Sequence, residues 1–332
     1  MKFNQYAFCL MAAVSSHGAF SSAPAALQVA KPTTTLFTDI DSIDNNVIAV
    51  GKFGTIVTSE DGQNWAQAQT PVQSLLTAVT VKSENAAWAC GHDATIVHST
   101  DNGKTWQLQQ YLPEKGKPCL DIEFIDETVG FAIGAYGMFY KTTDAGATWQ
   151  SHFISDFVHP DDKEYLADLK QDDPEAYEDE IKFILPHFNR LLITDNAFYL
   201  VGEMGLVAQS TDQGLTWQKF DEFYPGSFFS VAKMAQDKTV VAGLRGNAFY
   251  KTTNSEEFYE IDIPQTATIN TILPLKNKAL LFANSGMVHT FDGNKVTTEQ
   301  LPSGHAILSA TVFKNKVIMA TEKGLITWGE SK

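Results

Sequence analysis

A short motif that recurs four times constrains this chain more than any other feature. It reads Ser/Thr-x-Asp-x-Gly-x-Thr-Trp, the pattern known as an Asp box, and residues 99–106 carry the clearest copy. In such a turn the Asp accepts backbone N–H groups, the Gly adopts a positive φ, and the Trp opens the next strand. We therefore interpret these residues as structural. The copies supply Asp61, Gly62 and Trp65; Asp101, Gly103 and Trp106; Asp144, Gly146 and Trp149; and Asp212, Gly214 and Trp217.

A second repeat precedes the Asp box, namely a small or apolar strand that ends in Gly-x-x-Gly or a degenerate form of it. Its first positions lie 40, 43, 68, 41, 40 and 38 residues apart, at Gly51, Gly91, Gly134, Gly202, Gly243, Ala283 and Thr321. Seven units of about 40 residues match the blade length of a β-propeller. We predict an all-β fold over residues 26–332, a single seven-bladed β-propeller of four-stranded blades.

The second unit shows how the strands of one blade follow each other. Alternating and apolar runs predict its four strands at residues 76–81, 86–90, 95–99 and 106–110. The Gly-x-x-Gly tips join the second strand to the third and the Asp boxes join the third to the fourth, so the two motifs face opposite ways. The last unit has three strand signals only, and we expect residues 26–30 to supply its fourth strand, because an unpaired edge invites aggregation.

The interval of 68 residues contains an insertion between blades at residues 156–186. From Asp156 to Glu180 it has eleven acidic residues against two lysines, which gives −9 of the net charge of −15. Its apolar pattern predicts one or two short helices bounded by Pro160, Pro174 and Pro186. We favour a solvated acidic surface. The alternative is a lid or partner-docking element.

The N-terminus has the pattern of a secretory signal over residues 1–25. Lys2 precedes a short apolar run, and small residues follow it as a cleavage site. The run is too short to span a bilayer, so we expect an exported, periplasmic protein. Export would leave Cys90 and Cys119, which could pair in an oxidising compartment. Because Cys90 occupies a core strand position, we favour a buried free thiol.

Composition excludes several functions. The negative charge argues against nucleic-acid binding and against docking on an anionic membrane. Asp boxes occur in sialidases, but sialidase chemistry needs three arginines around a carboxylate, and this chain has only Arg190 and Arg245. No metal or nucleotide motif is legible, so we expect no cofactor, no metal and no enzymatic activity. A glycan-binding or glycan-hydrolysing propeller remains the alternative.

The tips give the best candidate binding surface, because their inner residues vary while the glycines persist. The turn does not require large side chains there, and exposed aromatic residues and an isolated Arg are typical interface anchors. The same face should carry the aromatic connection at residues 223–228. The opposing interpretation is that these rings pack on neighbouring blades. The candidate partner-binding residues are Phe53, His92, Tyr136, Met204, Arg245, Tyr224 and Phe228.

The combination of seven units, Gly-x-x-Gly tips and Asp boxes resembles the photosystem II stability/assembly factor family over about residues 33–328. The resemblance implies an exported, non-enzymatic propeller that holds a membrane-protein subunit during assembly. Photosynthetic members present an arginine-rich patch, which this chain cannot build from Arg190 and Arg245. We therefore expect a member from a non-photosynthetic bacterium, a monomer whose partner is a protein of another envelope complex.

Overall fold

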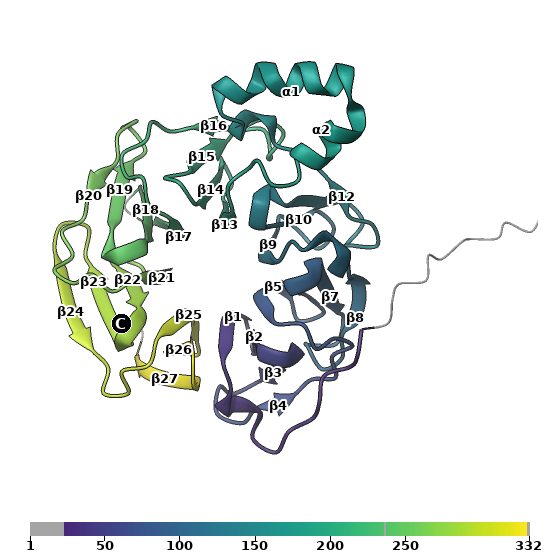
Figure 1. Cartoon of the computed structure of the whole chain (residues 1–332). Helices are drawn as coiled ribbons and strands as arrows, with labels where there is room; N and C mark the ends of the chain where they lie inside the picture. The colour runs from purple at the N-terminus through teal and green to yellow at the C-terminus, as the bar shows by residue number, and fades with distance from the viewer. Residues whose placement is uncertain (1–22, 236, 331–332) are drawn as a thin grey trace, which may run out of the picture.

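The computed structural model describes residues 23–235 and 237–330, and it shows seven antiparallel sheets arranged in a ring (Figure 1). Six sheets have four strands and the seventh has three, each in sequence order from the axis outwards. The predicted seven-bladed β-propeller is confirmed. Blades 1 to 3 comprise β1 (Phe37–Ile43), β2 (Asn46–Gly51), β3 (Ile56–Ser59) and β4 (Ala66–Gln67); β5 (Leu76–Ser83), β6 (Ala86–Gly91), β7 (Thr95–Ser99) and β8 (Gln107–Gln110); and β9 (Cys119–Phe124), β10 (Gly130–Gly134), β11 (Phe139–Thr142) and β12 (Gln150–Ser151).

The remaining blades follow the same order. They comprise β13 (Phe188–Ile193), β14 (Phe198–Gly202), β15 (Val207–Ser210) and β16 (Gln218–Lys219); β17 (Phe228–Met234), β18 (Lys238–Gly243), β19 (Ala248–Thr252) and β20 (Tyr259–Glu260); β21 (Ile269–Pro274), β22 (Ala279–Ala283), β23 (Met287–Phe291) and β24 (Val296–Gln300); and β25 (Ile307–Phe313), β26 (Lys316–Thr321) and β27 (Gly324–Glu330).

The second strand of each blade explains why the ring is stable. β2, β6 and β10 are buried along their whole length, since both of their faces pack against neighbouring blades. That burial accounts for their continuous apolar sequence, where a half-exposed strand would alternate. The core is therefore a set of interfaces between blades, distributed around the ring.

One backbone hydrogen bond recurs in all seven blades. The N–H of the residue after the first tip position donates to the carbonyl just before the inner strand, at 2.9–3.1 Å. The bond also forms in the degenerate sixth and seventh units, so the seven-fold register predicted from sequence spacing holds throughout. The pairs are Lys52 to Leu36, His92 to Leu75, Ala135 to Pro118, Glu203 to His187, Leu244 to Ser227, Asn284 to Thr268, and Glu322 to Ala306.

The expected closure by residues 26–30 is wrong. These residues lie beside the outer edge of blade 1, where the Ala26 N–H donates to the Thr70 carbonyl at 2.9 Å and Gln67 bonds the backbone of Leu27 and Val29. Pro32, which has no N–H to donate to a sheet, instead opens a 3-10 helix (Pro32–Thr34) that leads into β1.

Blade 7 closes the ring by packing directly on blade 1. The Ser42 hydroxyl lies 2.8 Å from the Thr311 hydroxyl and donates to the Val312 carbonyl, and the Lys314 ammonium donates to the Glu60 carbonyl. Side chains of β1 and β26 share one buried cluster that includes Phe313. The three-stranded last blade is thus held through its inner strands, without a fourth strand among the described residues.

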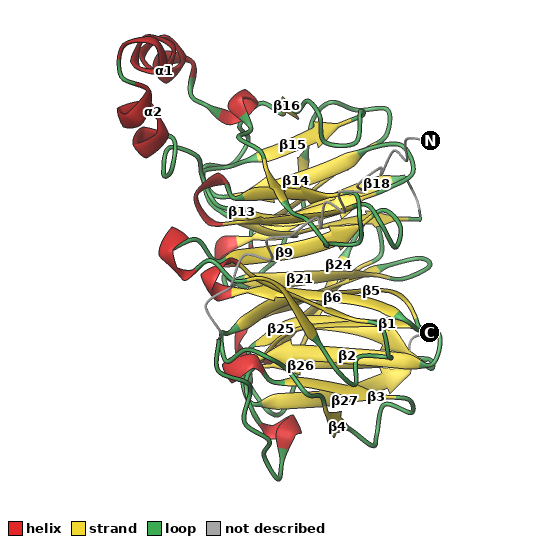
Figure 2. Cartoon of the chain, turned by 90° about the vertical axis from the view of Figure 1, so that its right-hand side faces the viewer, coloured by secondary structure: helices red, strands yellow, loops and turns green. Residues whose placement is uncertain are grey.

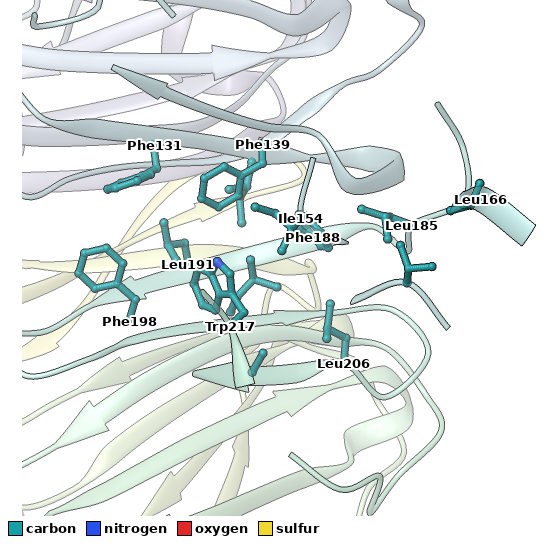
Figure 3. Close-up of a cluster of buried hydrophobic side chains, with 14 residues drawn as sticks. Phe131, Phe139, Ile154, Leu166, Leu185, Phe188, Leu191, Phe198, Leu206 and Trp217 are labelled. Atoms are coloured by element: carbon teal, nitrogen blue, oxygen red, sulfur yellow. The ribbon is translucent and has the colours of Figure 1, made fainter. Parts of the chain in front are cut away.

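The insertion contains two helices, as the prolines predicted. They are α1 (Pro160–Asp172) and α2 (Pro174–Glu180), each with Pro at its start. The segment is anchored, because Leu166 and Leu185 belong to the buried cluster of blades 3 and 4 (Figure 3). The Asp156 carboxylate also accepts the Trp217 N–H at 2.9 Å. Its acidic residues are mostly exposed, so the segment is a solvated surface that Leu166 and Leu185 anchor in the core.

Cys90 and Cys119 form a disulfide with a Cα–Cα distance of 5.8 Å, so the free thiol that we favoured is wrong. Cys90 does occupy a core position on β6, but the next blade places Cys119 at the start of β9, directly opposite. The bond therefore joins blades 2 and 3. The sequence could not show this, because the partner comes from the neighbouring repeat.

The disc has two distinct faces (Figure 2). The tips form short 3-10 turns on one side, together with α1 and α2, and we call this side the tip face. The Asp boxes lie on the other side, which we call the Asp-box face. The 3-10 turns are Lys52–Gly54, His92–Ala94, Ala135–Gly137, Leu244–Gly246 and Asn284–Gly286.

Candidate functional site

The Asp boxes are internally satisfied turns. In blade 2 the Ser99 hydroxyl accepts the Gly103 N–H at 3.0 Å, and the Asp101 carboxylate accepts the N–H and the hydroxyl of Thr105 at 2.9 and 2.6 Å. The Trp106 indole N–H donates back to the Gly103 carbonyl at 2.9 Å. These are the bonds of the turn expected from the sequence, and they leave the Asp little freedom for chemistry.

The other three copies repeat this arrangement. Asp61, Asp144 and Asp212 accept equivalent backbone and side-chain bonds. Bonds from the hydroxyl and the N–H of Thr216 lower the pKa of Asp212 to about 2. A carboxylate held ionised in this way is a turn former and a poor proton donor at neutral pH.

The tips place large side chains on strained backbone. Phe53, Tyr136, Met204 and Arg245 all have φ between +53° and +59°. That left-handed region favours Gly and Asn and costs other residues about 1–2 kcal/mol. The chain thus keeps bulky residues at positions where its fold would prefer small ones.

Five predicted binding residues are exposed on the tip face. Phe53 is 63% exposed, with the Lys52 ammonium 4.5 Å from its ring centre, and Met204 is 71% exposed. His92, Tyr136 and Arg245 are also exposed at their tips. These five side chains belong to blades 1 to 5 and present a broad surface, without converging on one point.

Phe228 and Tyr224 do not belong to that surface. Phe228 is fully buried between blades 4 and 5, so a surface role for it is wrong. Tyr224 is half-buried, and its hydroxyl donates to the Leu244 carbonyl and accepts from Asn247. For these two rings the opposing interpretation, packing on a neighbouring blade, is the correct one.

The end of the insertion locks onto the tips of blades 3 and 4. The ring of Tyr136 stands edge-on to Phe183 and His187, with centroids 5.0 and 4.6 Å apart. His187 reaches the Glu203 carboxylate at 3.4 Å. Gly137 donates its N–H to the Pro186 carbonyl at 2.9 Å and has φ +67°, and a Cβ there would come within 2.6 Å of Leu185. Phe183 thereby becomes part of the tip face, which the sequence did not predict.

A charged cluster on the inner strands was also missed. The Arg190 guanidinium lies 3.0 Å from Asp121 and 4.0 Å from Asp39, and Lys82 lies 4.0 Å from Glu123. The inner strands of successive blades lie side by side around the axis. The third residue of the inner strand is Asp39 in blade 1, Asp121 in blade 3 and Arg190 in blade 4. Comparing the repeats at this position would have shown the signal.

The cluster has more carboxyl groups than cations. Asp39, Asp121 and Asp41 each accept an N–H from the inner strand of the next blade, at 2.7–2.9 Å. Burial raises the pKa of Asp41 to about 6, and burial with the charge of Asp121 raises the pKa of Glu123 to about 8. Their hydrogen bonds connect blades 1 to 4 around the axis. The excess of carboxyl groups over cations has an electrostatic cost.

A cavity of about 470 Å³ opens on the Asp-box face between blades 3 and 4. Lys82, Glu123, Asp195 and Gln213 are among its lining residues. The described residues offer no group of three or more His, Cys, Asp or Glu that could hold a metal ion. Nor does the described part of the chain include a helix long and apolar enough to cross a membrane.

These features define the class of the protein as a seven-bladed Asp-box β-propeller with a helical insertion on its tip face. The chain belongs to the photosynthesis system II assembly factor YCF48 family, whose model matches residues 109–290, more than half of its length. A BNR/Asp-box repeat model matches residues 97–108, the second Asp box.

One curated relative is a photosystem II assembly lipoprotein, Ycf48 of Synechococcus sp. (strain CC9902). It is 26% identical over 151 residues, which cover 45% of this chain and 38% of the relative. The chain therefore matches well under half of that relative's length.

Solved structures share the fold at low identity. YCF48 bound to D1 peptide matches with a TM-score of 0.68 and 16% identity, covering 92% of this chain and 98% of that one. YCF48 from Cyanidioschyzon merolae gives 0.66 and 14%, covering 89% and 96%. The WD40 β-propeller domain of Doa1 gives 0.62 and 13%, covering 88% and 92%.

Proposed function

We propose that this protein is an exported, non-enzymatic assembly or stability factor that binds a protein partner through its tip face. The observation that carries the proposal is the set of bulky side chains on left-handed backbone at the tips. Exposed bulky residues in a strained backbone conformation point to a role other than folding. Membership of a family of assembly factors, one of which has a solved structure with a bound peptide, supports the same conclusion.

Export is supported by two features. The pattern of residues 1–25 is that of a secretory signal, although residues 1–22 lie outside the described part of the chain. The disulfide between Cys90 and Cys119 would form and persist in an oxidising compartment such as the periplasm.

The partner should differ from that of a photosynthetic member. Arg190 is engaged with Asp121 on the inner strands, which leaves Arg245 as the arginine on the tip face. The exposed acidic residues of α1 and α2 lie on the same side. An envelope complex with basic and apolar contact residues fits this surface better than a client selected by an arginine patch.

The test compares two exposed residues of blade 4. Met204 on the tip face and Leu215 on the Asp-box face are 71% and 72% exposed. We expect Met204→Asn to lose most of the partner recovered from envelope extracts by the tagged wild type, and Leu215→Asn to recover it fully. Equal recovery by both variants would remove the tip face from the proposal.

The insertion needs a separate test. Deleting it would remove Leu166 and Leu185 and uncover the buried cluster on which they pack, so neutralising its outer charges is the better design. A variant with Asp161→Asn, Asp162→Asn and Glu164→Gln should fold normally. Unchanged partner recovery would mean that the insertion is a solvated surface and not a docking element.

A second candidate is a glycan site, favoured by the cavity on the Asp-box face. Glu123 lines it, and its raised pKa would make it a proton donor near neutral pH. A glycan array and a hydrolysis screen, each repeated with Glu123→Gln, test this candidate. A specific signal lost in the variant would favour it over the scaffold.

A further inference from the structure

A groove of about 610 Å³ runs across the tip face between blade 3 and the end of the insertion. Lysines from two separate segments meet there, Lys115 and Lys117 from the connection between blades 2 and 3, and Lys182 from the insertion. Tyr136 and Phe183 form its apolar wall. The chain has a net charge of −15, so a groove that contains three lysines stands out from the rest of the molecule by its positive charges.

Lys117 is a half-buried ammonium without a carboxylate partner. None of the ion pairs within the described ranges, 23–235 and 237–330, includes Lys117 or Lys115. The Lys117 Nζ donates to the Tyr136 carbonyl at 3.0 Å and lies 5.8 Å from the centre of the Phe183 ring. Burial, together with the charges of Lys115 and Lys182, lowers its pKa. A cation in this position costs folding free energy until an anion joins it.

The backbone around Lys117 is fixed on both sides. Its carbonyl accepts the N–H of Ala94, in the tip of blade 2, at 3.1 Å. The next carbonyl, of Pro118, accepts the N–H of Ala135, in the tip of blade 3, at 3.0 Å. Cys119 then carries the disulfide. The ammonium therefore projects from a rigid base, which reduces the entropy that a ligand must overcome.

The groove has acidic residues as well, and they limit what can bind. Glu114 and Glu178 line it, and Lys182 is paired with Asp179. Lys115 and Lys117 are the cations that remain for a ligand. A single carboxylate beside an apolar group would satisfy them, whereas a strongly acidic ligand would be repelled by the insertion.

We propose that this groove binds an extended segment of the partner protein that carries one acidic side chain next to an aromatic or aliphatic one. Lys117 holds the carboxylate, and Tyr136 and Phe183 contact the apolar side chain. The proposal rests on the proposed function, since it names the chemistry that the tip face recognises. Proteins that bind extended peptides commonly read individual side chains with separate pockets.

The test uses the full exported chain and a phage-displayed library of random dodecapeptides joined to the coat protein at their C-termini. We expect enrichment of sequences with one Asp or Glu beside an apolar residue. Synthetic, C-terminally amidated copies should bind wild type, and Lys117→Met should weaken them at least tenfold. Replacing the peptide's Asp by Asn should have a similar effect, and Lys117→Arg should retain part of the affinity.

Lys104→Met is the matched control, because Lys104 lies in an Asp box on the opposite face. The melting temperature of Lys117→Met should equal or exceed that of wild type, which separates lost binding from lost folding. Peptides that bind Lys117→Met as tightly as wild type, peptides without an acidic residue, or a requirement for a free C-terminus would each overturn the proposal. So would a failure to enrich any peptide.

The proposed function can fail separately. Partner recovery that depends on Met204 but not on Lys117 would support the tip face as the binding surface and contradict the groove as the peptide site. Recovery that depends on neither residue would contradict both proposals.

Discussion

The turns on the two faces of this propeller share one backbone feature, a residue with positive φ, but they carry different kinds of side chain. Both have residues other than Gly with positive φ in their turns, at Asn102, Ala145 and Gln213 on the Asp-box face and at Phe53, Tyr136 and Met204 on the tip face. The Asp-box residues at these positions are small or polar. The tip residues are large and apolar in three of six blades, and the others are Asp93, Arg245 and Ser285.

The difference separates scaffold from surface. On the Asp-box face the polar side chains bond within their own turn, so the turn is complete in itself. On the tip face the backbone bonds are equally regular in all seven blades, but the side chains differ from blade to blade. The fold therefore determines the backbone contacts of the tips but not their side chains. We propose that partner binding determines the side chains.

The disulfide should have the largest effect on stability. It ties blade 2 to blade 3 and closes a loop with a sequence separation of 29 residues. A double variant, Cys90→Ser with Cys119→Ser, should lose about 3–4 kcal/mol of unfolding free energy. Denaturant unfolding measures this, with reduced wild type as the control. A loss below about 1 kcal/mol would show that packing between the blades suffices.

Removing an Asp-box carboxylate should be the next largest change. Asp101→Ala leaves the N–H and the hydroxyl of Thr105 without their acceptor and should cost about 1–3 kcal/mol. Partner binding should not change, because the damage is on the other face. Asp195→Ala, an exposed carboxylate on the same face, is the control and should be neutral. Lost binding in a folded Asp101→Ala would break the separation of the faces.

The inner cluster predicts a pH dependence. Burial raises the pKa of Glu123 from 4.5 to about 8, so the folded state holds this proton more tightly than the unfolded state. Its contribution to stability is complete below pH 4.5 and is lost as the pH rises through 8. Glu123→Gln should therefore stabilise the protein at pH 8 by about 1–2 kcal/mol and have less effect at pH 5.

Thermal unfolding at the two pH values measures this change, with the exposed Glu127→Gln as control. Equal effects of Glu123→Gln at both pH values would mean that Glu123 keeps one protonation state from pH 5 to pH 8, which would contradict a pKa of about 8.

The smallest stability effect is expected at the tips. Met204→Asn should raise stability by up to about 1 kcal/mol, because Asn tolerates the left-handed backbone at φ +55°. The same variant should lose partner binding. Differential scanning calorimetry beside the pull-down measures both, and Leu215→Asn should change neither. A destabilised Met204→Asn would show that the side chain serves the fold.

The sequence was sufficient to predict the fold, because each repeat shows the same motifs at the same spacing. Spacing and the two motifs gave seven blades, the strands of blade 2 to within two residues, and the opposite placement of tips and Asp boxes. What it could not give were contacts between repeats. Cys119 faces Cys90, and Arg190 faces Asp121, only because the ring brings separate units together.

The candidate surface was predicted in part for the same reason. The turn chemistry of a tip is local, so exposure at Phe53 and Met204 follows from the motif. Phe228 opens an inner strand, and the neighbouring blade buries it. The closure failed because Pro32 diverts the chain before β1, and glutamine side chains of blade 1 bind the preceding residues.

The central claim is that a partner contacts the tip face and not the Asp-box face. A photo-crosslinking amino acid placed at position 204 or at position 215 tests it most directly, since both sites belong to blade 4 and are equally exposed. We predict a crosslinked partner from position 204, competed by unlabelled wild type, and none from position 215. The same partner crosslinked from position 215, with none from 204, would contradict the account.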